Sequence, residues 1–347
     1  MCDINDIRSL KEFRSETFSK FHKSKVQKEL CICINSNKLE PACYWSAELI
    51  CAGQFSDLWE IIIMCLGKFI YIGSPKLPIY ISIRFNEFKN ILNNGYVGNE
   101  LALRNNIKIR QLFGEIISIL CESRKKHRIE QIKINKLEDF EINIMAEKLK
   151  ASHIKYLDSI FQKGDPKELF IPLNELSYNI ESKNTVEACY WVEWILEYQK
   201  LCDKKKESYK CQRRTFVKIN QIYQMDPIWI VWEIINSHIK NKLCGKIIDA
   251  LLTIFCIKYS PSIKKKRRYI IYFAISLLTE EYSNNVSIIT DKNKINSVVN
   301  KINIIYNEVK KNEIAPNTDY LFNGLEKNKS NLEKTIEKLE KMNSLIF

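Results

Sequence analysis

Hydrophobic side chains recur at helical spacing along most of this chain. Trp59, Ile62, Ile63 and Leu66 stand three and four residues apart, which places them on one face of a helix. Few residues would break such helices, since the 347 residues include nine Gly and eight Pro. The pattern predicts an all-α fold with helices over 77–92, 103–121, 169–180, 185–209 and 269–278 and after Asp226-Pro227.

Turn signals predict how the first of these helices are connected. Gly53 follows a periodic segment that starts near Pro41, and it suits the C-terminal end of a helix. Ser56-Asp57 then offers an N-cap for the helix that carries Trp59. Two helices joined by so short a turn are expected to lie antiparallel.

Three landmarks recur in the same order and predict a duplicated helical unit. Ala42-Cys43-Tyr44-Trp45 is repeated as 188–191, Trp59-Glu60 as Trp232-Glu233, and Ser74-Pro75 as Ser260-Pro261. The predicted fold is therefore two degenerate copies of one helical unit. The aromatic residues expected in the two equivalent cores are Tyr44, Trp45, Trp59, Tyr190, Trp191 and Trp232.

The repeat divides the chain into four predicted parts. Residues 1–40 form an N-terminal extension, 41–162 the first helical unit, 163–310 the second unit with a basic insertion, and 311–347 a linker and a C-terminal helix. That last helix is amphipathic, because Leu332, Ile336, Leu339 and Met342 are spaced by four, three and three residues. It either packs on its own chain or binds a partner, and packing is the commoner outcome.

Two interpretations apply to the tryptophans and to the acidic residues near them. Exposed aromatic rings stack on nucleobases, but these lie in apolar helical stripes, which favours a packed core with each indole N–H satisfied. Glu48 and Glu193 could form an acid pair for proton transfer, whereas exposed helix flanks are the more usual place for such residues.

Charge and cysteine content narrow the class of protein. The formal net charge of +13 predicts attraction to nucleic acid, acidic proteins or anionic membrane surfaces. Twelve cysteines without an apolar signal segment after Met1 indicate a reducing, intracellular setting. The longest apolar stretches, 58–73 and 247–259, carry charges and are too short to cross a bilayer, so we expect no membrane span.

Sequence signatures of catalysis and cofactor binding are lacking. The sequence holds no CxxC pair, and its four histidines are scattered, which disfavours zinc. Gly67-Lys68 and Gly245-Lys246 lack the rest of a phosphate-binding loop, and no nucleophile elbow occurs. We therefore expect a protein that is not an enzyme and has no cofactor.

Basic clusters are the clearest functional signal. One lies at 124–128; the other two lie in the second unit and would meet nucleic acid or an acidic partner if they shared one face. The alternative is that they are solvated loops. The predicted contact residues are Lys204, Lys205, Lys206, Lys210, Arg213, Arg214, Lys264, Lys265, Lys266, Arg267 and Arg268.

Part of the first unit resembles a known helical module. Tyr44-Trp45-Ser46-Ala47, Ala52-Gly53, Asp57-Leu58 and the turn at 72–78 are similar to the collar region of clamp-loader-related AAA+ ATPases. The resemblance implies an all-α oligomerisation or adaptor module associated with DNA replication or repair. The ATPase domain of that family has no counterpart in this sequence, so no catalytic residue is carried over. The segments 103–106 and 165–170 also resemble uncharacterised proteins of large nucleocytoplasmic DNA viruses.

These observations lead to one hypothesis with two alternatives. The first is a non-enzymatic adaptor that binds replication or repair partners, with DNA as an optional further partner of the basic clusters of the second unit. The second is a structural or assembly component of a virion, located in the host cytoplasm, a viral factory or the particle. The third is an enzyme built on an acid pair such as Glu48 and Glu193. Oligomeric state is left open by the sequence.

Overall fold

The computed structural model describes residues 3–126, 130, 132–135, 138–205, 209–314 and 336. These residues form helices and one isolated antiparallel bridge between Glu16 and His22, and the described part contains no sheet. The predicted all-α class is thus confirmed. Residues 325–346, where the sequence predicts an amphipathic C-terminal helix, lie outside the described residues apart from Ile336.

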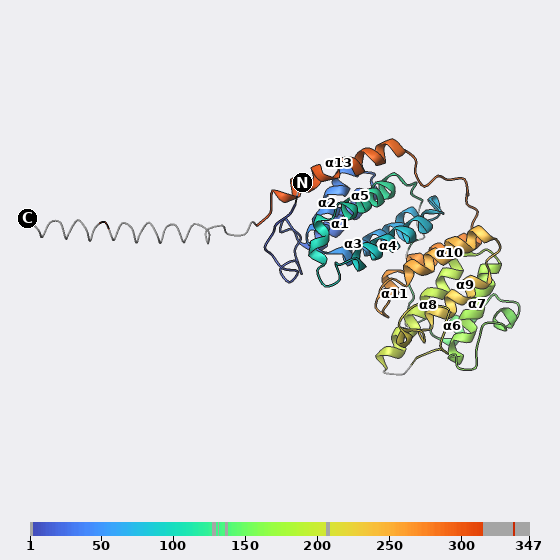
Figure 1. Ribbon diagram of the computed structural model, residues 1–347. Coiled ribbons are helices and arrows are strands. Elements are labelled where there is room, and N and C mark those ends of the chain that lie inside the picture. The colour runs from blue at the N-terminus through green and yellow to red at the C-terminus, as the bar shows by residue number, and fades with distance from the viewer. Residues whose placement is uncertain are drawn as a thin grey trace, which may run out of the picture.

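Two groups of helices build the molecule (Figure 1). The first group combines the N-terminal helices with α13. This helix lies near the end of the described residues and packs on α2 and α5. Its elements are α1 (Lys23–Asn35), α2 (Leu39–Cys51), α3 (Phe55–Cys65), η1 (Leu66–Ile70), η2 (Tyr71–Gly73), α4 (Leu77–Asn93), η3 (Glu100–Asn105), α5 (Ile107–Glu122) and α13 (Lys292–Lys310).

The second group follows in the chain and is built around α12. This helix contacts α7, α8, α9 and α10, as α5 contacts α1, α2, α3 and α4 in the first group. The elements of the second group are α6 (Ile142–Glu147), η4 (Lys155–Leu157), η5 (Lys167–Leu169), α7 (Phe170–Glu181), α8 (Thr185–Lys204), η6 (Gln221–Tyr223), α9 (Ile228–Ser237), α10 (Lys242–Phe255), α11 (Ile263–Lys266) and α12 (Arg268–Thr279).

The α1–α2 and α7–α8 hairpins close with the same turn. Asn37 and Lys183 both adopt positive φ, 56° and 58°, directly after the first helix of the pair. The next residue then donates its N–H five residues back, from Lys38 to Cys33 and from Asn184 to Asn179. This bond satisfies a carbonyl at the helix end, which explains why so short a connection folds the helices back on each other.

The tryptophan landmarks occupy matching places in the two groups. Trp45 lies six residues after the start of α2 at Leu39, and Trp191 lies six residues after the start of α8 at Thr185. Trp59 and Trp232 each lie four residues after the starts of α3 and α9. The Ser-Pro landmark does not match, because 74–75 precede α4 in one group whereas 260–261 follow α10 in the other. The duplication itself stays a prediction.

Contacts between the groups form a single interior. Helix α4 packs on α10, and the η1–η2 segment packs on α12. Tyr71 has a φ of 52° and directs its hydroxyl toward Ser276, while its ring lies 5.3 Å from that of Phe273. The buried apolar side chains of both groups make one continuous core.

The predicted domain boundaries differ from the observed packing in two places. Residues 1–40, predicted as an extension, contain α1, which forms a hairpin with α2 across the boundary at 40. Helix α13 falls in the predicted second unit but packs on α2 and α5 of the first group. The polar linker 280–291 allows this return, because it connects α12 to α13 without a helix.

Candidate functional site

The basic cluster 264–268 is turned largely into the protein. Lys264 is 4% exposed, and its ammonium lies 2.8 Å from Asp226 Oδ2 and 2.5 Å from Gln199 Oε1. Asp226 also accepts from the Tyr259 hydroxyl at 2.9 Å and from the backbone N–H of Ile228 at 3.1 Å. A buried ammonium with a carboxylate and an amide as partners is an internal ion pair, so Lys264 is unavailable to a phosphate.

Arg267 has an equally internal role. Its side chain is 1% exposed, and its guanidinium donates to the carbonyls of Phe255 and Ile257, at 2.8 and 2.5 Å, and to Glu60 of α3. The first two bonds satisfy carbonyls at and just beyond the end of α10, and the third joins the two helix groups. The guanidinium therefore fixes the position of α10 relative to α3.

The other three cations of this cluster differ in whether they have acidic partners. Arg268 donates to Glu193 at 2.8 Å, and Lys265 donates to Glu197 at 2.5 Å. Lys266 is exposed and forms no ion pair within the described residues. The prediction that 264–268 forms a phosphate-binding face is thus wrong for Lys264 and Arg267. These two cations are buried against acids from α3 and from the segment before α9. Lys266 is left as an exposed cation.

The basic insertion after α8 divides in a different way. Arg214 is 2% exposed and pairs with Asp165 at 2.7 Å and Glu233 at 2.6 Å. Lys204, Lys205 and Lys210 are exposed and form no ion pair in the described part of the chain. Arg213 is also exposed and donates to the amide oxygen of Gln224 at 2.6 Å, whereas Lys206 lies outside the described residues.

Backbone contacts hold this insertion against the body. Cys211 N–H donates to the Met225 carbonyl at 2.9 Å, and Arg214 N–H donates to the Gln224 carbonyl at 3.0 Å. Gln212 N–H donates to Asp165 Oδ1 at 2.9 Å. The insertion is therefore fastened at 211–214 by the buried Arg214–Asp165 pair, with exposed lysines on both sides of the attachment.

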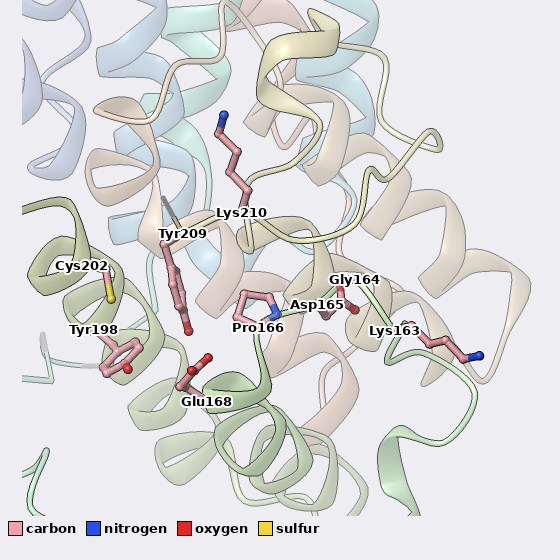
Figure 2. Close-up of a pocket in the computed structure, with 9 residues that line it drawn as sticks. All are labelled: Lys163, Gly164, Asp165, Pro166, Glu168, Tyr198, Cys202, Tyr209 and Lys210. Carbon is pink, nitrogen blue, oxygen red and sulfur yellow. The ribbon is translucent and has the colours of Figure 1, made fainter. Parts of the chain in front are cut away.

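A polar pocket lies where the insertion meets the end of α8 and the start of α7 (Figure 2). Its volume is about 370 Å³, within the range of small-ligand sites. In Figure 2 the hydroxyl of Tyr209 faces the carboxylate of Glu168, while the amines of Lys163 and Lys210 point away from this pair. The lining residues are Lys163, Gly164, Asp165, Pro166, Glu168, Tyr198, Cys202, Tyr209 and Lys210.

Tyr209 combines ring packing with an unsatisfied hydroxyl. Its ring meets that of Tyr198 edge-on at 5.4 Å and 68°, and Tyr198 in turn stacks on Trp194 at 5.0 Å and 10°. Its hydroxyl oxygen is buried and has no hydrogen-bond partner among the described residues. Burial raises the pKa of this hydroxyl above its ordinary value, so it stays protonated and is an available donor.

The six predicted core aromatics lie in or against the interior. Trp59, Trp191, Tyr190 and Trp232 are buried, and Tyr44 and Trp45 are partly buried against the same core. The expectation of satisfied indoles is wrong for three of them, because the N–H groups of Trp59, Trp191 and Trp232 are buried and find no hydrogen-bond partner in the part of the chain that the structure describes. Close aromatic packing surrounds these rings, as with Trp59 and Phe85 at 4.9 Å.

Glu48 and Glu193 are buried with separate sets of partners. Glu48 accepts from the backbone N–H of Ser19 at 3.0 Å and from its hydroxyl. Glu193 accepts from the Tyr272 hydroxyl at 2.8 Å and from Arg268. Burial raises the pKa of Glu193 despite the nearby guanidinium. Among the described residues the two carboxylates share no hydrogen-bond or ion-pair partner, and each has a structural role.

A larger cleft lies between α3 and α4 on one side and α10 on the other. Its volume is about 1010 Å³, and Phe55, Trp59 and Phe85 contribute to its wall. Charges of both signs line it, since three lysines and three acids contribute. Because these charges balance, the cleft shows no preference for an anionic partner. The charged lining residues are Lys89, Lys218, Lys258, Glu60, Glu100 and Asp249.

The described residues hold no group of three or more His, Cys, Asp or Glu side chains placed to bind a metal ion. Among the helices described, none has the length and apolar character needed to cross a membrane. Comparisons with protein-family models, curated proteins and solved structures find no match for this chain.

Sequence reasoning missed Tyr209 and Glu168 as site residues. Tyr209 lies three residues after the basic run 204–206, but Glu168 lies about 40 residues earlier, on η5. Only the attachment of the insertion to 162–165 brings the two together. The signal in the sequence is limited to the aromatic residue beside the lysines, which is a common feature of surfaces that bind nucleic acid.

Proposed function

We propose that this protein is a non-enzymatic helical adaptor that contacts nucleic acid through the exposed cations around the basic insertion. The observation that carries the proposal is that Lys163, Lys204, Lys205 and Lys210 are exposed and unpaired in the described residues. Lys163 and Lys210 line the pocket of Figure 2, and Lys204 and Lys205 lie within three residues of its Cys202. The buried neighbour Arg214 anchors this basic surface and leaves the lysines free for a partner.

The expected chemistry is recognition of phosphate by point charges. Each lysine that neutralises a phosphate releases condensed counterions, so affinity falls with salt by a slope of about 0.7 per contact on single strands. Four contacts would give a slope of about 3 in a plot of log affinity against log salt. Acidic protein surfaces attract the same lysines by unlike charge, so the salt slope is measured on nucleic acid itself.

The protein partners that we propose are replication or repair proteins. The collar-like resemblance at 44–58 and 72–78 implies an association with replication or repair proteins, and it supports an adaptor over an enzyme. In this proposal the first helix group provides a protein-binding scaffold, and the insertion of the second group contacts DNA. Affinity capture of the full chain, followed by identification of the bound proteins, tests this partner class.

Binding of fluorescent 20-nucleotide single strands, followed by anisotropy from low to moderate salt, tests the DNA contact. We expect a steep salt dependence that is reduced in Lys204→Ala/Lys205→Ala/Lys210→Ala. The control is Lys108→Ala/Lys292→Ala/Lys301→Ala, which removes three exposed lysines of α5 and α13 and therefore the same net charge. Equal losses in the two variants, or binding that salt does not change, would refute the proposal.

A further inference from the structure

We propose that the pocket formed by Tyr198, Tyr209 and Glu168 accepts one unstacked nucleobase of a single-stranded nucleic acid. This inference rests on the proposed function and adds to it a site for the base. The pocket, the unpartnered Tyr209 hydroxyl and the placement of the lysines carry it together.

The charge arrangement of the pocket matches a nucleotide with its base inside and its phosphate outside. Glu168 contributes a carboxylate at the polar end of the cavity, where a phosphate would be repelled. Lys163 and Lys210 line the same pocket, but their amines point away from Glu168 in two different directions (Figure 2), so a phosphate would meet them outside the cavity. Asp165 does not alter this pattern, because it is buried and paired with Arg214.

Hydrogen bonding then distinguishes among the bases. The protonated Tyr209 hydroxyl is a donor without an acceptor, and Glu168 is an acceptor opposite it. A base that presents an amino group beside a ring nitrogen or carbonyl satisfies both, and cytosine does so with its N4 amino group and N3. Thymine can donate only its N3–H, and the two carbonyl oxygens that flank this group would both lie beside the carboxylate and be repelled by it. We therefore expect cytosine to bind better than thymine.

Aromatic contacts favour a base over other neutral ligands of this size. The rings of Tyr198 and Tyr209 form one wall, and Tyr198 is held in place by stacking on Trp194. Bases stack on such side chains whatever their sequence, and single-stranded nucleic acids supply bases that are already unpaired. A duplex would first have to extrude its base, so the pocket selects single strands.

The test compares oligo-dC and oligo-dT of 12 nucleotides for binding to the full chain at one salt concentration. Wild type should bind oligo-dC about two- to tenfold more tightly, as expected for one or two added hydrogen bonds. Tyr209→Phe and Glu168→Gln should each remove most of this preference. Glu168→Gln should not weaken total binding, because it removes a negative charge near the phosphates.

The matched control is Glu181→Gln, which neutralises an exposed carboxylate at the other end of α7 and should keep the preference for oligo-dC. Salt-dependent binding with equal affinity for the two oligonucleotides, or a preference that survives Glu168→Gln, would overturn the pocket assignment and leave the proposed function intact. Absence of binding to either oligonucleotide would overturn both.

Discussion

Replacing Lys264 by methionine should unfold the protein far more readily than replacing its neighbour Lys266. The ammonium of Lys264 lies 2.8 and 3.0 Å from the two carboxylate oxygens of Asp226, and both side chains are about 5% exposed. Methionine fills a similar volume but has no charge. The carboxylate would then keep only the Tyr259 hydroxyl and one backbone N–H as donors.

The magnitude follows from the burial of the pair. Removing one partner of a buried ion pair costs about 3–5 kcal/mol, because the remaining charge stays desolvated. Lys266 is exposed and unpaired among the described residues, so Lys266→Met should change the free energy of unfolding by less than about 0.5 kcal/mol. The two lysines are two residues apart in the sequence, but the expected losses in the free energy of unfolding differ by about 3 kcal/mol or more.

Urea denaturation followed by circular dichroism measures the difference. The double variant Lys264→Met/Asp226→Asn should recover a large part of the loss, because an amide is cheaper to bury than an unpaired carboxylate. A Lys264→Met protein as stable as Lys266→Met would refute the internal pair. It would restore 264–268 as a surface for partners.

Two other predictions concern pH and the indole N–H groups. Burial raises the pKa of Glu193 above its ordinary value of 4.5, so its contribution to stability is present below that pH and is lost as pH rises through the folded-state pKa. Glu193→Gln should therefore reduce the loss of urea resistance as the pH rises above about 4.5, and an unchanged pH profile would contradict this. Trp59 and Trp194 are each 3% exposed, but only the Trp194 N–H has a partner, the Asp139 carbonyl at 2.9 Å. Trp194→Phe should cost about 1 kcal/mol more in urea unfolding than Trp59→Phe, and equal costs would show that this hydrogen bond contributes nothing.

Local pattern was enough to predict most helices. The residues that start and end α4 and α7 lie within two residues of the predicted bounds, and α9 starts directly after Asp226-Pro227, because apolar spacing, this dipeptide and the Gly-containing or polar turns are local signals. Helix α1 was missed as part of the folded unit. Its apolar face of Val26, Leu30 and Ile34 is diluted by lysines, and only the hairpin with α2 identifies it as core.

The contact surface could not be predicted in the same way, because charge partners are distant in sequence. Lys264 meets Asp226 across 38 residues, and Arg267 meets Glu60 across 207 residues. A run of five basic residues therefore looks like a solvated patch until tertiary folding supplies the acids. In the insertion after α8, the buried pair with Asp165 involves only Arg214. The described lysines of this insertion therefore stay exposed.

Acetylation of lysines, read by mass spectrometry with and without a single-stranded oligonucleotide, tests the division between contact and structural cations most directly. Lys204, Lys205 and Lys210 should react in the free protein and be protected by the oligonucleotide. Lys264 should be unreactive in both states, and exposed Lys292 should react equally in both. Protection of Lys264 to Lys266 on binding, with no change at 204–210, would contradict the account.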